Sequence, residues 1–345
     1  GQLITAFGLG YAVLAPTLTP AASGRSRRAV LAGGLLVFAV ANGLAALAPN
    51  YWLLLAARLL ASCGAALYTP AALALASEQS RPERRGQSMA VVLSGATAAA
   101  VVGVPAGLFL AAALGWRAAF AVIAGGSACV ACILAVRVTP SRVPHVRAPA
   151  IRAVLADRHI QGIAAVTLLA YLGEFTLYSY LGLALTSVAR VTTHLIPVYY
   201  LLFGAAGVAG NITGGRGSDR WAARYVADCA LGLLAISLIT FPLLLFSKDL
   251  VAGPLASCGF AAWMLSVPQQ RRLLARRPDA SATVLGLNQS ALYLGLSLSG
   301  ITGALLLRVV SISDLGYAAA CIVLIALVVS LSGNSAATGT PAGQP

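Results

Sequence analysis

The sequence predicts an all-α polytopic membrane protein built of two helical bundles. Of its 345 residues, 59% are hydrophobic and only 9% are charged, whereas a soluble domain carries about 25% charged residues. The apolar residues gather in runs of about 20, the length of helix that crosses a hydrocarbon core about 30 Å thick. A membrane barrel would instead alternate with period two over about ten residues, and the sequence lacks that pattern.

Five apolar runs precede the most polar stretch of the chain. Short turns separate them, and most of these turns are basic, as at Arg25, Arg27 and Arg28. Each run is apolar and long enough to predict one spanning helix. The expected helices of this first half are 3–22, 29–48, 52–76, 88–113 and 118–136.

The polar stretch, residues 137–159, holds five arginines and three prolines and predicts a basic linker. The chain thus divides into an N-terminal bundle (1–136), this linker, a C-terminal bundle (160–332) and an uncharged tail (333–345) whose composition predicts disorder. The expected helices of the second half are 160–185, 195–214, 225–246, 251–267, 282–307 and 316–331.

Alternate loops carry most of the positive charge. The positive-inside rule places these Arg-rich loops, the central linker among them, in the cytoplasm. The net charge of +14 then reflects orientation in the bilayer, and we expect no nucleic-acid partner. The Arg-rich loops are 25–28, 81–85, 137–159, 216–224 and 271–277.

The two halves differ by one helix. With the expected orientation, helix 3–22 runs from the outside inward, and five helices precede the linker where six follow it. Many transporters are built from two matched repeats. We therefore expect one further helix, of about 20 residues, before Gly1, so that eleven of twelve spans are present.

Signatures of catalysis and metal binding are missing from the sequence. The six cysteines fall inside apolar runs, where they act as small hydrophobic side chains. Cys129 and Cys132 have metal or redox spacing but no second pair and no nearby histidine. There is no Walker loop, Gly-x-Ser-x-Gly or His-Glu-x-x-His motif. We expect no enzyme activity, no cofactor and no metal.

A series of short motifs runs in order along nearly the whole chain, from residue 6 to about residue 331. Together they resemble the major facilitator superfamily, and within it the bacterial branch of drug–proton antiporters and sugar (arabinose) efflux permeases. The motifs are PNYWLLLAAR at 49–58, GAALYTP at 64–70, RPERRG at 81–86, GVPAG at 103–107, GWRAAF at 115–120, GN at 210–211, GGRGSDR at 214–220, PQ at 268–269 and LNQS at 287–290.

The resemblance implies the major facilitator fold, two pseudo-symmetric bundles in the bacterial cytoplasmic membrane. The first half would supply the family's helices 2–6 and the second half its helices 7–12. The missing helix would then be the family's first, which contributes to the central cavity.

Two charged residues are expected deep within spans, Arg58 and Glu174. A charge inside a bilayer costs at least about 2.5–3.5 kcal/mol on insertion scales. Their positions along the helices place both at similar depth, and the resemblance places both helices around the cavity. We hypothesise that Glu174 exchanges a proton in competition with Arg58 or a cationic substrate. The alternatives are a static Arg58–Glu174 pair, or two unrelated groups in small wet pockets.

Small residues line the expected helix 88–113 at every fourth position. Such a stripe lets two helix backbones approach closely, and Pro105 removes one backbone hydrogen bond within it. The resemblance associates this helix with antiport, and simple close packing is the alternative. The stripe consists of Gly95, Ala99, Gly103, Gly107 and Ala111.

The stretch 214–220 is expected to turn sharply, because Gly214 and Gly215 permit a tight turn. Asp219 could accept hydrogen bonds from the N-terminus of the next helix and pair with Arg216 or Arg220. The resemblance implies that this stretch is a gate latch on the cytoplasmic side.

The matching loop of the first half keeps Arg25, Arg27 and Arg28 but has no aspartate. We expect a weaker latch there, unless Glu78 or Glu83 takes the place of the aspartate. The loop is otherwise polar and short, as a cytoplasmic turn requires.

Aromatic and amide side chains within the spans could line the cavity. Tyr68, Tyr178 and Trp263 could form an aromatic wall, although aromatic residues near span ends are often interface anchors. Asn211 and Asn288 could contact substrate or join helices through hydrogen bonds.

These features predict a proton-coupled exporter of a small organic solute or drug, which works by alternating access. Its expected partners are the bilayer, the solute and protons, and we expect it to act as a monomer. The alternatives are a non-transporting truncated paralogue or sensor and, among transporters, sugar or metabolite efflux. An acid in the cavity would fit a cation, whereas a neutral polar cavity would fit a sugar.

Overall fold

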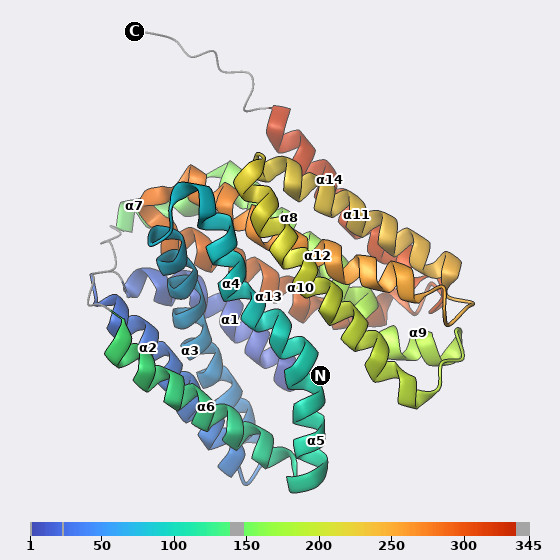
Figure 1. Cartoon of the computed structure of the whole chain (residues 1–345), viewed down its shortest axis with the longest axis horizontal. Helices are drawn as coiled ribbons and strands as arrows, with labels where there is room; N and C mark the ends of the chain where they lie inside the picture. The colour runs from blue at the N-terminus through green and yellow to red at the C-terminus, as the bar shows by residue number, and fades with distance from the viewer. Residues whose placement is uncertain (1, 23, 139–147, 336–345) are drawn as a thin grey trace.

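The computed structural model describes residues 2–22, 24–138 and 148–335, and this part of the chain is helical without any β-strand, which confirms the all-α prediction (Figure 1). Short 3-10 turns at Pro82–Arg84, Thr193–Leu195 and Pro278–Ala280 join some of the helices. The helices are α1 (Gln2–Ala21), α2 (Arg27–Leu47), α3 (Tyr51–Glu78), α4 (Arg85–Ala98), α5 (Val104–Leu114), α6 (Trp116–Arg137), α7 (Ala148–Ala156), α8 (Arg158–Tyr178), α9 (Leu181–Ser187), α10 (Ile196–Arg220), α11 (Ala223–Leu244), α12 (Ala252–Arg276), α13 (Ser281–Leu306) and α14 (Leu315–Ser335).

Eight described helical segments are long and apolar enough to cross a membrane. The other three expected spans are α1, whose apolar stretch is only Thr5–Leu18, the pair α4 and α5, and α12. A π-helical turn at Ala99–Gly103 separates α4 from α5. Helix α12 ends in a polar segment that carries glutamines and arginines. The structure thus interrupts two of the expected spans, 88–113 at Ala99–Gly103 and 160–185 between α8 and α9, and extends α10 and α12 beyond the expected ends, while the exact number of spans stays a prediction.

The helices of the first half, α2, α3 and α6, pack together on one side of the molecule, and α8, α11, α12 and α14 pack together on the other (Figure 1). The two groups meet where α1 packs on α13 and α4 packs on α10. A cluster of buried apolar residues crosses this junction, with Met89 and Leu93 on one side and Val267 and Leu285 on the other. The outer faces are apolar and exposed, as lipid contact requires.

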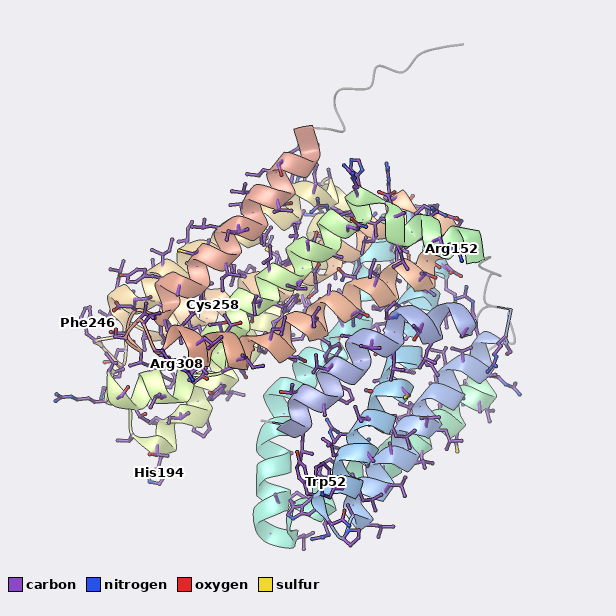
Figure 2. All side chains as sticks on the ribbon, turned by 180° about the vertical axis from the view of Figure 1, so that it is seen from behind. Trp52, Arg152, His194, Phe246, Cys258 and Arg308 are labelled. Carbon is purple, nitrogen blue, oxygen red and sulfur yellow. The ribbon has the colours of Figure 1, made fainter. Side chains whose placement is uncertain are left out.

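One end of the molecule carries the linker helix α7. Figure 2 shows Arg152 of α7 at the opposite end from Trp52 and His194. The ends of α3, α10 and α12 lie with α7 at this end, which we call the basic end because the Arg-rich loops are there. Residues 139–147 of the linker and most of the tail, 336–345, lie outside the described residues, so the predicted disorder of the tail stays a prediction.

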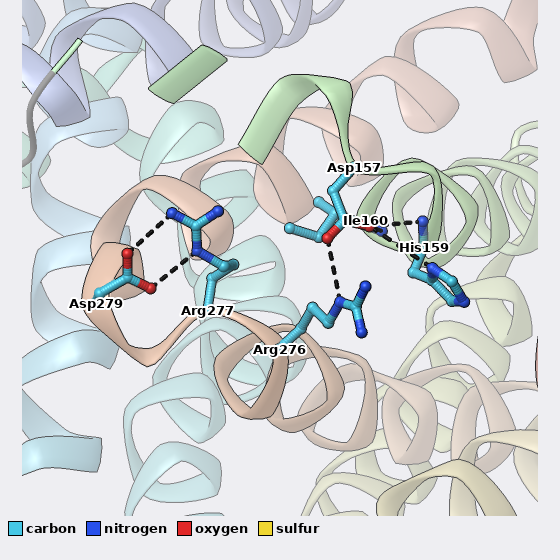
Figure 3. Close-up of polar contacts among 6 residues, drawn as sticks. All are labelled: Asp157, His159, Ile160, Arg276, Arg277 and Asp279. Atoms are coloured by element: carbon cyan, nitrogen blue, oxygen red, sulfur yellow. Dashed lines mark hydrogen bonds and ion pairs between the residues drawn. The ribbon is translucent and has the colours of Figure 1, made fainter. Parts of the chain in front are cut away.

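Asp157 joins α7 to α8 at the basic end (Figure 3). Its carboxylate caps α8 by accepting the backbone N–H groups of His159 at 2.9 Å and Ile160 at 3.4 Å. It also accepts a hydrogen bond of 3.1 Å from Nε of Arg276, at the end of α12. Burial raises the pKa of Asp157, but these hydrogen bonds and the charge of Arg276 outweigh it and hold the pKa below its ordinary value.

We expect Asp157→Ala to lower the free energy of unfolding by about 1 kcal/mol at neutral pH, because the helix cap and the Arg276 bond are lost together. A carboxyl group whose pKa is lowered in the folded state stabilises the fold at pH values above its pKa in the unfolded chain, which is about 3.9. That contribution is lost as the pH falls through the folded pKa. The Tm difference between wild type and variant in detergent should therefore shrink below about pH 4.

Asp279→Ala is the matched control. Asp279 pairs with Arg277 at 2.9 Å in the same region, but more than half of its side chain is exposed. An exposed ion pair contributes little to the free energy of unfolding, so the Tm of this variant should stay near that of wild type. Equal losses in the two variants, or a pH-independent loss in Asp157→Ala, would contradict the role of Asp157.

Candidate functional site

Asp219 connects the two halves at the basic end. It lies on α10, its side chain is 4% exposed, and its carboxylate accepts the backbone N–H groups of Gly86 at 2.8 Å and Gln87 at 3.0 Å. These are among the first N–H groups of α4, which have no partner within their own helix and lie at the positive end of the helix dipole. Arg271 of α12 donates to the same carboxylate. Asp219 thus joins α4 of the first half to α10 and α12 of the second.

Two details of the expected latch are wrong. Residues 214–220 continue α10 and form no turn, because the polar end of the helix extends beyond the apolar run that predicts a span. Asp219 pairs with Arg271, whereas Arg216 and Arg220 are exposed. Side chains next to each other along a helix do not face one another, so Arg220 cannot turn back onto Asp219 easily.

Glycines allow α10 to approach its neighbours closely. A Cβ added at Gly215 would lie 2.8 Å from the Cβ of Ala90 on α4, and one added at Gly86 would collide with the Gly215 carbonyl oxygen. Gly214 faces the backbone of Met264 on α12 in the same way. The side-chain amide of Asn211 lies in the contact between α10 and α4 as well.

Asn211 is completely buried, and its Nδ2 donates to the Ala90 carbonyl oxygen at 2.8 Å. It therefore joins α10 to α4, one of the two roles that the sequence allowed. It does not line either cavity described below.

A second polar contact joins the halves nearby. Arg27, which is 6% exposed, pairs with Glu78 at the end of α3. The other oxygen of Glu78 accepts a hydrogen bond of 3.3 Å from Ser281 at the start of α13. Glu78 is thus the acid that pairs with an arginine of the first-half loop, one of the two substitutes for an aspartate that the sequence allowed. Arg25 and Arg28 of that loop are exposed.

The expected glycine stripe makes no close contact in this conformation. A Cβ added at Gly95 or Gly107 would meet no heavy atom of the described chain within 4 Å, and one added at Gly103 would meet only Ala99 of the same helix. The side chain of Pro105 is outside the described positions. The role of the stripe in antiport stays a prediction.

A small polar cavity of about 70 Å³ lies between the bundles, next to the contact between α4 and α10. Trp263 and Asn288 line it, as expected, whereas Tyr68 and Tyr178 do not. Tyr178 instead packs against Tyr200 and Phe203 within the second half. Most of its described lining residues carry an amide or hydroxyl group, although most of the wall surface is apolar, and no acidic side chain is among these residues. The polar lining residues are Thr167, Tyr171, Ser266, Gln269, Gln270, Asn288, Gln289 and Tyr293.

Hydrogen bonds fix most of this wall. Thr167 donates to Oδ1 of Asn288 at 2.7 Å and accepts from Nε2 of Gln269 at 3.2 Å. Tyr171 and Ser266 share a hydrogen bond of 2.6 Å. By contrast, Oε1 of Gln270 and Oε1 of Gln289 are buried and have no partner in the described chain. The cavity lining therefore contains two free acceptors.

Arg58 and Glu174 are not brought together. The Arg58 guanidinium lies over the rings of Phe7 at 4.7 Å and Phe120 at 5.9 Å, all within the first half. Glu174 is 2% exposed in α8, and neither carboxyl oxygen has a hydrogen-bond partner among the described residues. The static Arg58–Glu174 pair that the sequence allowed is not formed in this conformation.

The sequence reasoning missed Arg271, Thr167 and Gln270. Arg271 was counted among loop arginines, although it belongs to α12. The pair Gln269–Gln270 follows the apolar run 251–267 directly and precedes Arg271, so the sequence indicates a loop there and gives no sign that these amides are buried. Thr167 gives no such sign either, since a threonine hydroxyl in a helix can donate its hydrogen bond to a backbone carbonyl of the preceding turn.

Comparison with known proteins agrees with this architecture. Residues 1–300 match the family described as Major Facilitator Superfamily. The chain is 30% identical over 335 residues to the uncharacterized MFS-type transporter YbcL of Bacillus subtilis, covering 96% of this chain and 85% of that protein. It is 31% identical over 315 residues to a chloramphenicol resistance protein of Streptomyces lividans, covering 88% and 71%.

Among solved structures, the human organic anion transporter MFSD10 superposes with a TM-score of 0.81 at 19% sequence identity. The match covers 96% of this chain and 83% of that one. At this identity the likeness concerns the fold alone.

We expect Gly86→Ala to open the contact between α4 and α10. The added methyl group would meet the Gly215 carbonyl and, at 2.8 Å, Oδ1 of Asp219. The backbone cannot move aside without breaking the Asp219 hydrogen bonds. Hydrogen-exchange mass spectrometry should show exchange of the first amides of α4 at least about tenfold faster, which corresponds to roughly 1.4 kcal/mol.

Gly95→Ala, on the same helix, is the control, since its methyl group would meet nothing within 4 Å. It should leave the exchange of these amides unchanged. Unaltered exchange in Gly86→Ala would show that this contact does not hold the halves together.

Proposed function

We propose that this chain, which belongs to the Major Facilitator Superfamily, is a secondary active exporter of a small, uncharged organic solute in a bacterial cytoplasmic membrane. In this proposal the basic end faces the cytoplasm. The Arg-rich loops at that end support the orientation through the positive-inside rule. The name of the Streptomyces relative, a chloramphenicol resistance protein, supports efflux.

Alternating access would use the contacts at the basic end as a gate. The described conformation has Asp219 capping α4 and Glu78 linking Arg27 to Ser281. We infer that these contacts close the cytoplasmic side and break when the two halves rock. A buried carboxylate that takes some of its donors from the opposite half is suited to such a switch, because separation of the halves removes those donors and exposes the carboxylate to water.

The cavity lining carries the proposal about the solute. Its described lining combines amide, hydroxyl and aromatic groups with the apolar side chains of Leu93, Ala96 and Leu292, without an acidic side chain. Such a wall offers no ion-pair partner to a cation, and its free acceptor at Gln270 suits a hydroxyl or amide donor. This composition favours an uncharged hydrogen-bonding solute, such as a sugar-like metabolite or a neutral drug, over a cationic drug.

Proton coupling is assigned to Glu174 in this proposal. Both of its oxygens are buried without partners, an environment that stabilises a carboxylate poorly. Glu174 lies one helical turn from Tyr171, which lines the cavity. Proton uptake and release at Glu174 would therefore be sensed by α8, the helix that also carries part of the solute site.

We expect Glu174→Gln to abolish solute transport driven by a pH gradient in proteoliposomes while solute exchange without a gradient continues. Gln keeps the shape of the side chain but cannot release a proton. Glu83→Gln, at an exposed position, is the control and should transport as wild type. Gradient-driven transport at the wild-type rate in Glu174→Gln would remove the coupling role.

We expect Gln270→Met to raise the KM for the exported solute about tenfold, because one hydrogen bond in a dry site is lost at nearly constant side-chain volume. Thr240→Val, at a half-buried position of α11 that lines neither cavity, is the control. A solute that carries a positive charge, with an unchanged KM in Gln270→Met, would contradict the proposed solute class.

A further inference from the structure

A second and larger cavity, of about 950 Å³, lies at the basic end. Its walls come mainly from the second half, from α8, α12, α14 and the junction of α10 with α11. The first half adds Ser77 of α3 and Arg85 of α4. Because both halves contribute, the cavity is complete only while the basic ends are together. It is separate from the polar cavity proposed to hold the solute.

Arginines dominate the lining. Six of them and His159 face the cavity, and no carboxylate is among its lining residues. Asp219 and Asp157 lie behind the wall and pair with Arg271 and Arg276. The arginines are Arg85, Arg158, Arg224, Arg271, Arg272 and Arg276.

Among the other four lining arginines, three have no carboxylate partner within the described chain. Arg272 is connected to Asp228 through Ser330, which accepts from Arg272 at 3.1 Å and donates to Asp228 at 2.6 Å. Arg85, Arg158 and Arg224 have no carboxylate partner among the described residues. Three arginines around one cavity repel each other unless an anion joins them.

Two further groups in the wall are unsatisfied hydrogen-bond donors. Ser218 lines the cavity, is 4% exposed, and its Oγ has no partner in the described chain. Helix α11 begins here with Ala222 at its N-cap, so no side chain caps its first N–H groups. A helix of this length with an open N-terminus binds anions. A hydroxyl, free backbone N–H groups and guanidinium groups are together the donors that hold a phosphate group.

The rest of the lining is apolar. Ile163, Val166 and Val329 continue from the arginines along α8 and α14 toward the membrane interior. Trp221, at the rim, is 64% exposed, as is typical of aromatic residues at a membrane interface. The cavity therefore combines a phosphate-binding rim with an apolar wall.

We propose that this cavity binds the phosphate group of an anionic ligand, either the headgroup of an anionic phospholipid or a soluble phosphate, and that binding holds the two basic ends together. Arg85 from the first half and Arg158 from the second are the guanidinium groups left to bind it, and Arg224, which stacks on Tyr225 and donates to its hydroxyl at 2.6 Å, adds its positive charge. The ligand replaces the missing carboxylates and so favours the conformation in which Asp219 caps α4. Basic pockets between membrane helices recognise anionic headgroups by the same chemistry.

The test measures the Tm of the purified chain in detergent micelles that contain either phosphatidylglycerol or phosphatidylcholine at equal mole fraction. A second pair of samples contains inorganic phosphate or chloride at equal ionic strength. We expect phosphatidylglycerol to raise the Tm relative to phosphatidylcholine. A rise with inorganic phosphate as well would identify soluble phosphate as a ligand, and a rise with the lipid alone would identify the headgroup.

The variants Arg158→Gln and Arg224→Gln should each weaken binding of the ligand about tenfold, as loss of one charge-assisted hydrogen bond implies. Ser218→Ala tests the same cavity without a change of charge and should weaken binding less. Arg81→Gln is the control, because Arg81 is exposed at the same end but does not line the cavity. Equal responses in Arg158→Gln, Arg224→Gln and Arg81→Gln would overturn the proposal.

Native mass spectrometry of the wild-type chain from micelles with both lipids gives a readout that needs no variant. Retention of phosphatidylglycerol over phosphatidylcholine supports the headgroup. No Tm rise with either anion, together with equal retention of the two lipids, would also overturn the proposal.

Discussion

Asp219 holds a negative charge in a place that water barely reaches, and donors on two other helices compensate that charge. A buried carboxylate without such donors would be strongly destabilising. The compensation depends on a close approach of α4 and α10, which in turn depends on the missing side chains of Gly86 and Gly215. The hydrogen bonds of Asp219 and the close packing of α4 on α10 therefore depend on each other. The contacts of Asn211 and the apolar cluster around Met89 extend the same junction toward the membrane interior.

The sequence allowed the class of fold and most helices to be predicted, because apolar length and arginine placement are local properties. Two of the residues expected around a central cavity, Trp263 and Asn288, line the small cavity, and their contact with a solute stays a prediction. Prediction from the sequence failed for contacts that depend on the rotation of a helix about its axis or on the residues that pack against it from distant parts of the chain. Arg58 and Glu174 have similar depth but point into different halves, and depth is all that position along a helix reveals. The partner of Asp219 lies 52 residues away at Arg271, beyond the reach of local pattern. Helix α7 was missed because nine residues within a basic linker give too weak a signal.

Two sets of polar groups in the second half bear on the proposed function. One lines the small cavity, where hydrogen bonds join Thr167 to Gln269 and Asn288, while Oε1 of Gln270 has no partner among the described residues. The other is Glu174, which has no hydrogen-bond partner among the described residues. Helix α8 carries members of both sets, with Tyr171 bonded to Ser266 at the cavity. In the proposed transport cycle, communication between proton and solute would therefore run along one helix and would not require direct contact.

The π-helical turn at Ala99–Gly103 affects how the small residues of this segment are aligned. In a regular α-helix with 3.6 residues per turn, positions four apart drift around the axis by about 40° at each step. A π-helical turn takes up more residues per turn, so it rotates the following positions back. The drift from Gly95 to Ala99 is thus opposed before Gly107. An uninterrupted α-helix over the same residues would wind the small residues further around its circumference, whereas the wider turn reduces that winding.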